Sequence, residues 1–164
     1  MTTAPLTVSR VFKAPVALVW AVHTDPKHQA QWLSPGNPDG YQSRMDFREG
    51  GTHFYGMPAP DGSLMYGIQT FREIVPQKKV VLVQSFADKD GNVAPHPMAP
   101  TWPQEMLSTN LYEDLGDGTT KLSVTWEPLN ATAIEEATFD GARPGMKGGW
   151  DMQFGQIEAY LATL

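Results

Sequence analysis

The C-terminal stretch of the chain constrains the fold more than any other segment. Apolar residues recur there at steps of three and four positions, which is the spacing of one face of an α-helix. The residues on this face are Met146, Trp150, Phe154, Ile157, Leu161 and Leu164. We expect this face to lie across a surface built from the earlier part of the chain. A long helix across a curved sheet commonly leaves a cavity between the two, so the pattern favours a fold with a pocket.

The earlier part of the chain is predicted to be mostly strand. Alternating apolar and polar residues indicate strands over 6–13, 41–49, 52–57, 64–75, 79–87, 105–113 and 119–127. Two short helices are expected after the first strand, one opening at Pro15 and one capped by Asp25. A further helix over 131–139 is interrupted near 140–145, before the terminal helix. Sequential strands with helices at the ends indicate an α+β fold with an antiparallel sheet, in one domain over residues 1–164.

Composition excludes several classes of function. The chain of 164 residues carries 12 Lys plus Arg against 18 Asp plus Glu, a net charge of -6 without a basic cluster, so no nucleic-acid partner is expected. No apolar run approaches the ~20 residues needed to span a membrane, and no signal-peptide pattern opens the sequence. The absence of cysteine excludes disulfides, thiolate metal sites and cysteine nucleophiles. These features predict a cytoplasmic protein.

The sequence predicts neither a cofactor nor a metal ion. Nucleophile motifs, phosphate-binding glycine loops and dinucleotide fingerprints are absent. A zinc site needs three or four converging ligands, often four positions apart on one helix. His23 and His28 are five apart across an expected helix break, and His96 is distant from both. We therefore interpret the three as surface histidines.

One predicted strand carries a polar pair that could take part in chemistry. Alternation over 52–57 places His53 and Tyr55 on the same face. On an inward face, the imidazole would supply a proton acceptor near neutral pH and the phenol a hydrogen-bond donor. With Arg44 or Glu105 nearby, the pair could orient or polarise a carbonyl ligand. On an outward face both would be ordinary solvated side chains, and alternation alone does not decide between the two.

Wide aromatic rings and thioethers are frequent enough to form an adaptable apolar cavity between sheet and helix. Trp102 lies in a proline-rich segment, residues 93–103, where its ring has no local core to join. We interpret that segment as a lid over the pocket or as a subunit contact, which would make the protein a homodimer. The residues predicted to contact a ligand are Trp20, Trp32, His53, Tyr55, Trp102, Met106, Trp126, Met146, Trp150 and Phe154.

Three segments make the chain similar to a known family. They are residues 14–32, with Ala-Pro-Val-Ala-Leu-Val-Trp at their start, residues 71–81 around Pro76, and residues 142–161 around Gly148-Gly149-Trp150. They resemble the opening helix pair, the strand–proline–strand segment and the closing helix of homologues of the activator of the heat-shock-protein-90 ATPase. Those proteins belong to the START-like (SRPBCC) superfamily, together with polyketide cyclases and carriers of the birch-pollen-allergen type. The resemblance implies the helix-grip fold, a curved antiparallel sheet wrapped around a long C-terminal helix, usually with a hydrophobic cavity.

The leading hypothesis is the binding of a small hydrophobic molecule, such as a lipid or polyketide, between the sheet and the terminal helix, with no defined reaction. One alternative is an enzyme of the polyketide-cyclase or hydratase kind acting on a carbonyl compound through His53, Tyr55 and Arg44. Another is a chaperone-associated interaction module. Polar side chains converging in a pocket favour the enzyme, and an all-apolar pocket favours the carrier. A filled interior beneath an exposed apolar patch favours the interaction module.

Overall fold

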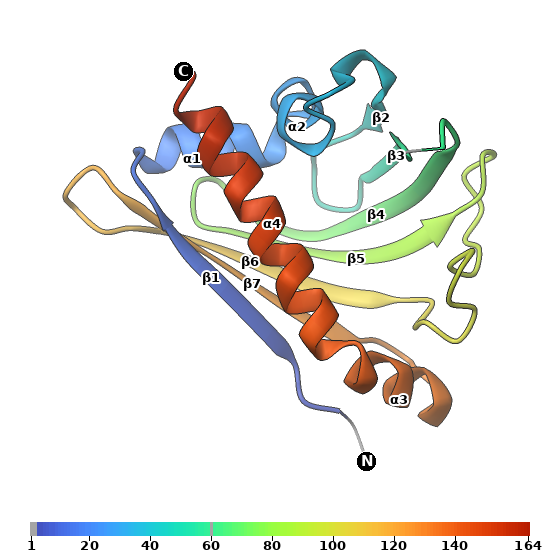
Figure 1. Cartoon of the computed structure of the whole chain (residues 1–164). Helices are drawn as coiled ribbons and strands as arrows, with labels where there is room; N and C mark the ends of the chain where they lie inside the picture. Colours follow the sequence, from blue (N-terminus) through green and yellow to red (C-terminus); the bar gives the residue numbers. More distant parts are fainter. Residues whose placement is uncertain (1–2, 60) are drawn as a thin grey trace.

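The computed structural model describes residues 3–59 and 61–164 and shows a long helix lying across a curved antiparallel sheet (Figure 1). The sheet has seven strands in the spatial order β1-β7-β6-β5-β4-β3-β2, and every neighbouring pair is antiparallel. The strands are β1 (Leu6–Phe12), β2 (Gln42–Met45), β3 (Thr52–Pro58), β4 (Leu64–Val75), β5 (Lys79–Ala87), β6 (Met106–Asp114) and β7 (Thr120–Pro128). The predicted α+β class and helix-grip arrangement are confirmed.

The helices gather at the two ends and on one face of the sheet (Figure 1). They are α1 (Val16–Thr24), α2 (Pro26–Leu33), the short 3-10 helix η1 (Pro38–Gly40), α3 (Ala133–Gly141) and α4 (Arg143–Leu161). Asp25 caps α2 as predicted, because its carboxylate accepts from the Lys27 amide at 2.9 Å. Thr132 and Glu135 form a reciprocal capping box at the start of α3. Within the described residues, every helix is too short or too polar to cross a lipid bilayer.

The second strand is shorter than the sequence predicts. Alternation indicates a strand over 41–49, but only Gln42–Met45 pairs with β3, and residues 46–51 form the connecting loop. Within that loop Phe47 packs on the core, with its ring centroid 5.1 Å from that of Phe71 and the two rings perpendicular. If β2 continued past Met45, the pleat of the strand would fix the direction of the Phe47 side chain. The strand ends early, and the Phe47 ring can pack against the core instead.

The helix interruption predicted near 140–145 is also narrower than expected. The third helix ends at Gly141 and α4 already begins at Arg143. Pro144 lies in the first turn of α4, where a missing backbone N–H breaks no helical bond. Leu164, predicted to belong to the apolar face of the terminal helix, instead lies beyond the end of α4 and is 59% exposed. The apolar face is therefore one residue shorter than its periodicity suggests.

The apolar face of α4 has two parts with different surroundings. Phe154 and Ile157 are at most 1% exposed and belong to the core. The Phe154 ring meets Phe12 of β1 edge to face, at 5.9 Å between ring centroids. Towards the N-terminus of the helix, Met146 and Trp150 are only half-buried and face a hollow. The C-terminal half of α4 thus fixes the helix on the sheet, while its N-terminal half roofs a cavity.

Candidate ligand-binding cavity

A cavity of about 570 Å³ lies between the sheet and the N-terminal half of α4. Its wall takes side chains from strands β2 to β7, from α1, α2 and α4, and from the segment between β5 and β6. Pockets that enclose small organic ligands commonly measure ~300–1,000 Å³. The space is therefore large enough for a molecule of several rings.

The structure brings eight of the ten sequence-predicted site residues into this wall. They are Trp32, His53, Tyr55, Trp102, Met106, Trp126, Met146 and Trp150. The face of β3 that carries the imidazole and the phenol is thus the inward one, a choice that alternation leaves open. Contact between these residues and a ligand stays a prediction.

Trp20 and Phe154 lie outside the wall, contrary to the prediction. Trp20 packs edge to face against Tyr112, at 4.9 Å between ring centroids, and borders a separate, smaller hollow. Phe154 is completely buried between Phe12 and Trp150. The reason is that helical periodicity assigns a residue to a face, but not to the stretch of that face under which the cavity happens to lie.

Indole rings and a thioether form the part of the wall next to β7 and α4. Trp126 and Trp150 meet edge to face, at 5.2 Å between ring centroids. Trp102 packs against Phe139 of α3 at 6.0 Å. Met106, at the start of β6, is 1% exposed to solvent. This region offers an apolar ligand flat aromatic surfaces beside an adaptable side chain.

The proline-rich segment over 93–103 forms part of the cavity wall. His96, Ala99 and Trp102 all line the cavity. The His96 ring meets Phe86 of β5 edge to face, with ring centroids 4.4 Å apart. The segment is thereby connected to β5 at one end and to α3 at the other. A role as a lid or as a subunit contact stays a proposal.

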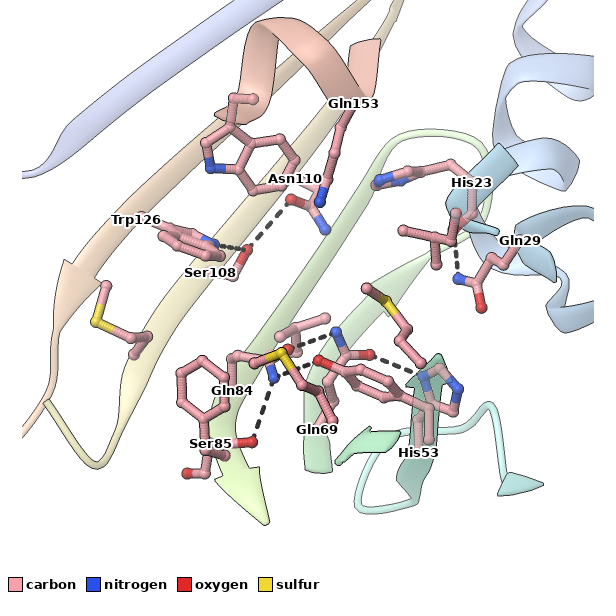
Figure 2. A pocket seen from close by; sticks show the side chains of 18 of the residues that line it. His23, Gln29, His53, Gln69, Gln84, Ser85, Ser108, Asn110, Trp126 and Gln153 are labelled. Atoms are coloured by element: carbon pink, nitrogen blue, oxygen red, sulfur yellow. Dashed lines mark hydrogen bonds between the residues drawn. The ribbon is translucent and has the colours of Figure 1, made fainter. Parts of the chain in front are cut away.

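A chain of polar side chains crosses three neighbouring strands on the cavity floor (Figure 2). His53, Gln69 and Gln84 stand opposite one another in register on β3, β4 and β5. His53 Nδ1 lies 3.0 Å from Gln69 Oε1, and Gln69 Nε2 donates to Gln84 Oε1 at 2.7 Å. Gln84 Nε2 donates in turn to the Tyr55 hydroxyl at 2.7 Å. At the opposite end, Ser43 Oγ lies 2.8 Å from His53 Nε2.

A second polar group lies on β6 beneath α4 (Figure 2). Trp126 Nε1 donates to Ser108 Oγ at 3.2 Å, and Ser108 Oγ donates to Asn110 Oδ1 at 3.3 Å. Gln153 of α4 and His23 of α1 face the same space. The cavity therefore combines an aromatic region with two separate sets of hydrogen-bonding groups.

Burial keeps four ionisable groups of the wall uncharged at neutral pH. Burial lowers the pKa of His23 to about 4. It also lowers the pKa of His53, an effect that the hydrogen bond to Gln69 partly offsets. Burial raises the pKa of Tyr55 and of Tyr112 above that of a free phenol. Both histidines are thus neutral and both phenols keep their protons.

The part of this wall that the structure describes carries no charged side chain. Among the described residues that line the cavity, none is Asp, Glu, Lys or Arg. Arg44 and Glu105, expected near His53 in the enzyme hypothesis, both lie outside. The Arg44 guanidinium lies 5.4 Å from the centre of the Phe54 ring, because alternation turns it to the other side of β2. An ionic ligand would therefore lose its hydration without gaining an opposite charge.

Sequence reasoning missed the amides of the wall, notably Gln69, Gln84 and Asn110. Each occupies an inward position of a strand next to a buried apolar or aromatic residue, namely Phe71 on β4, Leu82 on β5 and Tyr112 on β6. A polar residue that interrupts an inward apolar series needs a hydrogen-bond partner. This interruption is the signal that could have identified them.

The three histidines considered for metal binding are held apart by different partners. His23 Nδ1 is hydrogen-bonded to the Tyr112 hydroxyl. His28 Nδ1 lies 2.7 Å from the Tyr160 hydroxyl, and His96 packs on β5. Over residues 3–59 and 61–164, no group of three or more His, Cys, Asp or Glu side chains is arranged to hold a metal ion.

Sequence comparison assigns the chain to a family. The family model described as Activator of Hsp90 ATPase homolog 1-like protein matches residues 13–162. The chain belongs to this family. The match begins directly after β1 and includes all helices and every strand that lines the cavity. No curated protein is similar enough in sequence to count as a match.

Solved structures of similar fold come from several bacteria. Protein Ms6760 from Mycobacterium smegmatis has a TM-score of 0.74 at 23% identity, over 96% of this chain and 90% of that one. A protein from Arthrobacter aurescens has a TM-score of 0.76 at 24% identity, over 98% and 87% of the two chains. DynU16, a protein in the dynemicin biosynthetic locus, has a TM-score of 0.68 at 18% identity, over 98% of this chain and 48% of that one. At these identities the likeness shows the fold alone.

Proposed function

We propose that the protein binds a small, uncharged and mainly apolar molecule in the cavity beneath the N-terminal half of α4. The observation that carries this proposal is the composition of the wall, which encloses about 570 Å³ without a single carboxylate, ammonium or guanidinium group among its described residues. Apolar groups, among them several aromatic rings and thioethers, supply most of the contact surface, and amides and hydroxyls supply a few polar positions. Membership of the family supports a ligand-binding domain in general.

A ring-bearing ligand of the polyketide or lipid kind is in keeping with this wall. The paired indoles of Trp126 and Trp150 offer edge and face surfaces to a flat molecule. Met106 and Met146 can adapt to an irregular outline. DynU16, a protein in the dynemicin biosynthetic locus, has the same fold, which is in keeping with a ligand-binding domain in general.

A cyclase- or hydratase-like activity on a carbonyl compound is the second candidate. It is supported by the polar side chains that converge on the cavity floor, from His53 to Tyr55, with Ser43 bonded to His53 from outside the wall. Both nitrogens of His53 already face partners, Ser43 on one side and Gln69 on the other. A base that must first give up such a bond is poorly placed to take a proton from a ligand. We therefore favour binding over reaction.

The interaction-module hypothesis is less well supported. It expects a filled interior, whereas the space beneath α4 is hollow. Association with a chaperone, a homodimeric state and a cytoplasmic location stay predictions from the sequence and the family resemblance.

Native mass spectrometry followed by probe titration tests the proposal. We expect freshly purified protein to carry the mass of a small neutral molecule, or to bind Prodan, an uncharged naphthalene ketone fluorophore, saturably once any such molecule is removed. The anionic dye anilinonaphthalene sulfonate should bind much more weakly, because the described wall offers its charge no cationic side chain. Equal binding of the two dyes would contradict an uncharged ligand class. Absence of both a bound mass and saturable Prodan binding would contradict the proposal as a whole.

A further inference from the structure

One contact fixes the direction of the hydrogen-bond chain on the cavity floor. The side-chain amides of Gln69 and Gln84 and the imidazole of His53 could all be flipped by about 180°, which would exchange every donor in the chain with its acceptor. The backbone carbonyl of Ser85 removes this ambiguity. It lies 3.3 Å from Gln84 Nε2, a position that attracts an amide nitrogen and repels an amide oxygen. The side-chain nitrogen of Gln84 must therefore point to this end of the chain.

The orientation of the Gln84 amide determines the orientation of the Gln69 amide and the tautomer of His53. Gln84 Oε1 faces Gln69, which must present its nitrogen, as the 2.7 Å bond shows. Gln69 Oε1 then faces His53 Nδ1 at 3.0 Å, so that Nδ1 carries the imidazole proton. His53 Nε2 is left as an acceptor for the Ser43 hydroxyl at 2.8 Å. The imidazole is thus held neutral in one tautomer, in agreement with the lowered pKa of His53.

Tyr55 lies at the other end of the chain and keeps an unused proton. Its oxygen accepts from Gln84 Nε2 at 2.7 Å, so the phenol proton takes no part in that bond. None of the residues that the structure describes accepts this proton through a hydrogen bond, and the side chain lines the cavity. Because burial raises the pKa of Tyr55, the proton is retained at neutral pH. A buried donor without an acceptor is costly, and a ligand can supply the acceptor.

The phenol is also held in place before any ligand arrives. Tyr55 pairs with Gly67 on β4, and a Cβ at that glycine would collide with the ring and the hydroxyl of the tyrosine. The missing side chain lets the phenol lie across β4 and reach Gln84 on β5. A donor that is already fixed loses little conformational freedom on binding.

We propose that the Tyr55 hydroxyl, oriented by the chain from Ser43 through Gln84, donates a hydrogen bond to a carbonyl oxygen of the ligand. This inference rests on the proposed binding function and adds the ligand class: uncharged ring compounds that carry a ketone, quinone or ester. A pure hydrocarbon would leave the phenol proton unpaired. A carboxylate could accept that proton, but would find no cationic side chain in the described wall.

Two related probes and the Tyr55→Phe variant test this inference. Prodan carries a ketone, and dimethylaminonaphthalene is the same fluorophore without it. We expect Tyr55→Phe to weaken Prodan binding by about 2- to 12-fold, the range for loss of one neutral hydrogen bond, and to leave the affinity for dimethylaminonaphthalene unchanged. Tyr160→Phe is the matched control, because it removes a phenol hydroxyl that bonds to His28 and lies outside the wall. It should alter neither affinity.

Infrared spectroscopy of Prodan bound to the unmodified protein gives a readout that needs no variant. A hydrogen bond from Tyr55 should lower the carbonyl stretching frequency below its value in a hydrocarbon solvent. An unshifted frequency, or equal losses for both probes in Tyr55→Phe, would overturn the inference and leave the proposed function intact. If neither probe binds the unmodified protein and no small molecule co-purifies with it, the proposed function itself fails.

Discussion

Filling the cavity from α4 gives the sharpest test of where a ligand sits. Gly149 shares one helical face with Met146, Trp150 and Gln153, all of which line the cavity. A Cβ built at Gly149 meets no atom within 4 Å, so a leucine there can enter the cavity without displacing the backbone. Gly148 is equally unobstructed but faces solvent. Gly148→Leu is therefore the matched control for Gly149→Leu.

The two substitutions should have the same effect on stability and different effects on binding. Leucine is a better helix former than glycine by about 0.7 kcal/mol, which for a protein of 164 residues raises the melting temperature by about 2 °C. Only Gly149→Leu occupies space that the ligand needs. We expect it to raise the dissociation constant of Prodan on the order of tenfold, about 1.4 kcal/mol, and Gly148→Leu to leave that constant unchanged.

Fluorescence titration with Prodan and a thermal melt on the same preparations provide the measurements. If Gly149→Leu binds Prodan as tightly as Gly148→Leu does, the probe does not occupy the space beneath α4 and the reasoning is refuted. If Gly149→Leu alone melts at a lower temperature, the leucine does not fit the cavity, and the inferred free volume at this position is wrong.

Two further predictions concern stability. Phe154→Ala should cost about 3–5 kcal/mol in urea denaturation because the ring is fully buried, and Trp150→Ala should cost less because that ring borders a cavity; equal costs would contradict this division of α4. Acidification from pH 6.5 to 4 should lower the free energy of unfolding by about 3 kcal/mol at most. The reason is that His23 takes up a proton near pH 6.5 in the unfolded chain, but only near pH 4 in the folded protein, where its pKa is about 4. His23→Gln should reduce this pH dependence, and an unchanged slope would show that His23 is not its source.

Periodicity predicted the regular elements well, because it is a local property of the chain. The strands expected over 64–75 and 79–87 coincide with β4 and β5, and the stripe from Met146 to Leu161 belongs to one helix. The loop around Phe47 could not be predicted in the same way. Its position depends on contact with Phe71, which is distant in sequence, and this tertiary contact outweighs the local alternation.

The sequence predicted members of the candidate site only where the residue type alone suggests a role in the cavity wall. Large rings and thioethers are unusual enough to be chosen one by one, and most of those chosen line the cavity. The polar chain depends instead on register, since Gln69 meets both His53 and Gln84 only when β3, β4 and β5 are aligned as they are. A register shift between Phe71 and Glu73 also interrupts the pairing of β4 with β5. A shift of this kind cannot be located from alternation, so the partners of each glutamine could not be named.

The division of α4 separates two requirements that often conflict in a binding protein. We expect substitutions at Met146, Gly149 and Gln153, which line the cavity, to change which ligand is bound, and substitutions at the buried Phe154 and Ile157 to change stability. Each half can vary while the other is kept constant. A scaffold of this kind can acquire new ligand preferences without first gathering surplus stability.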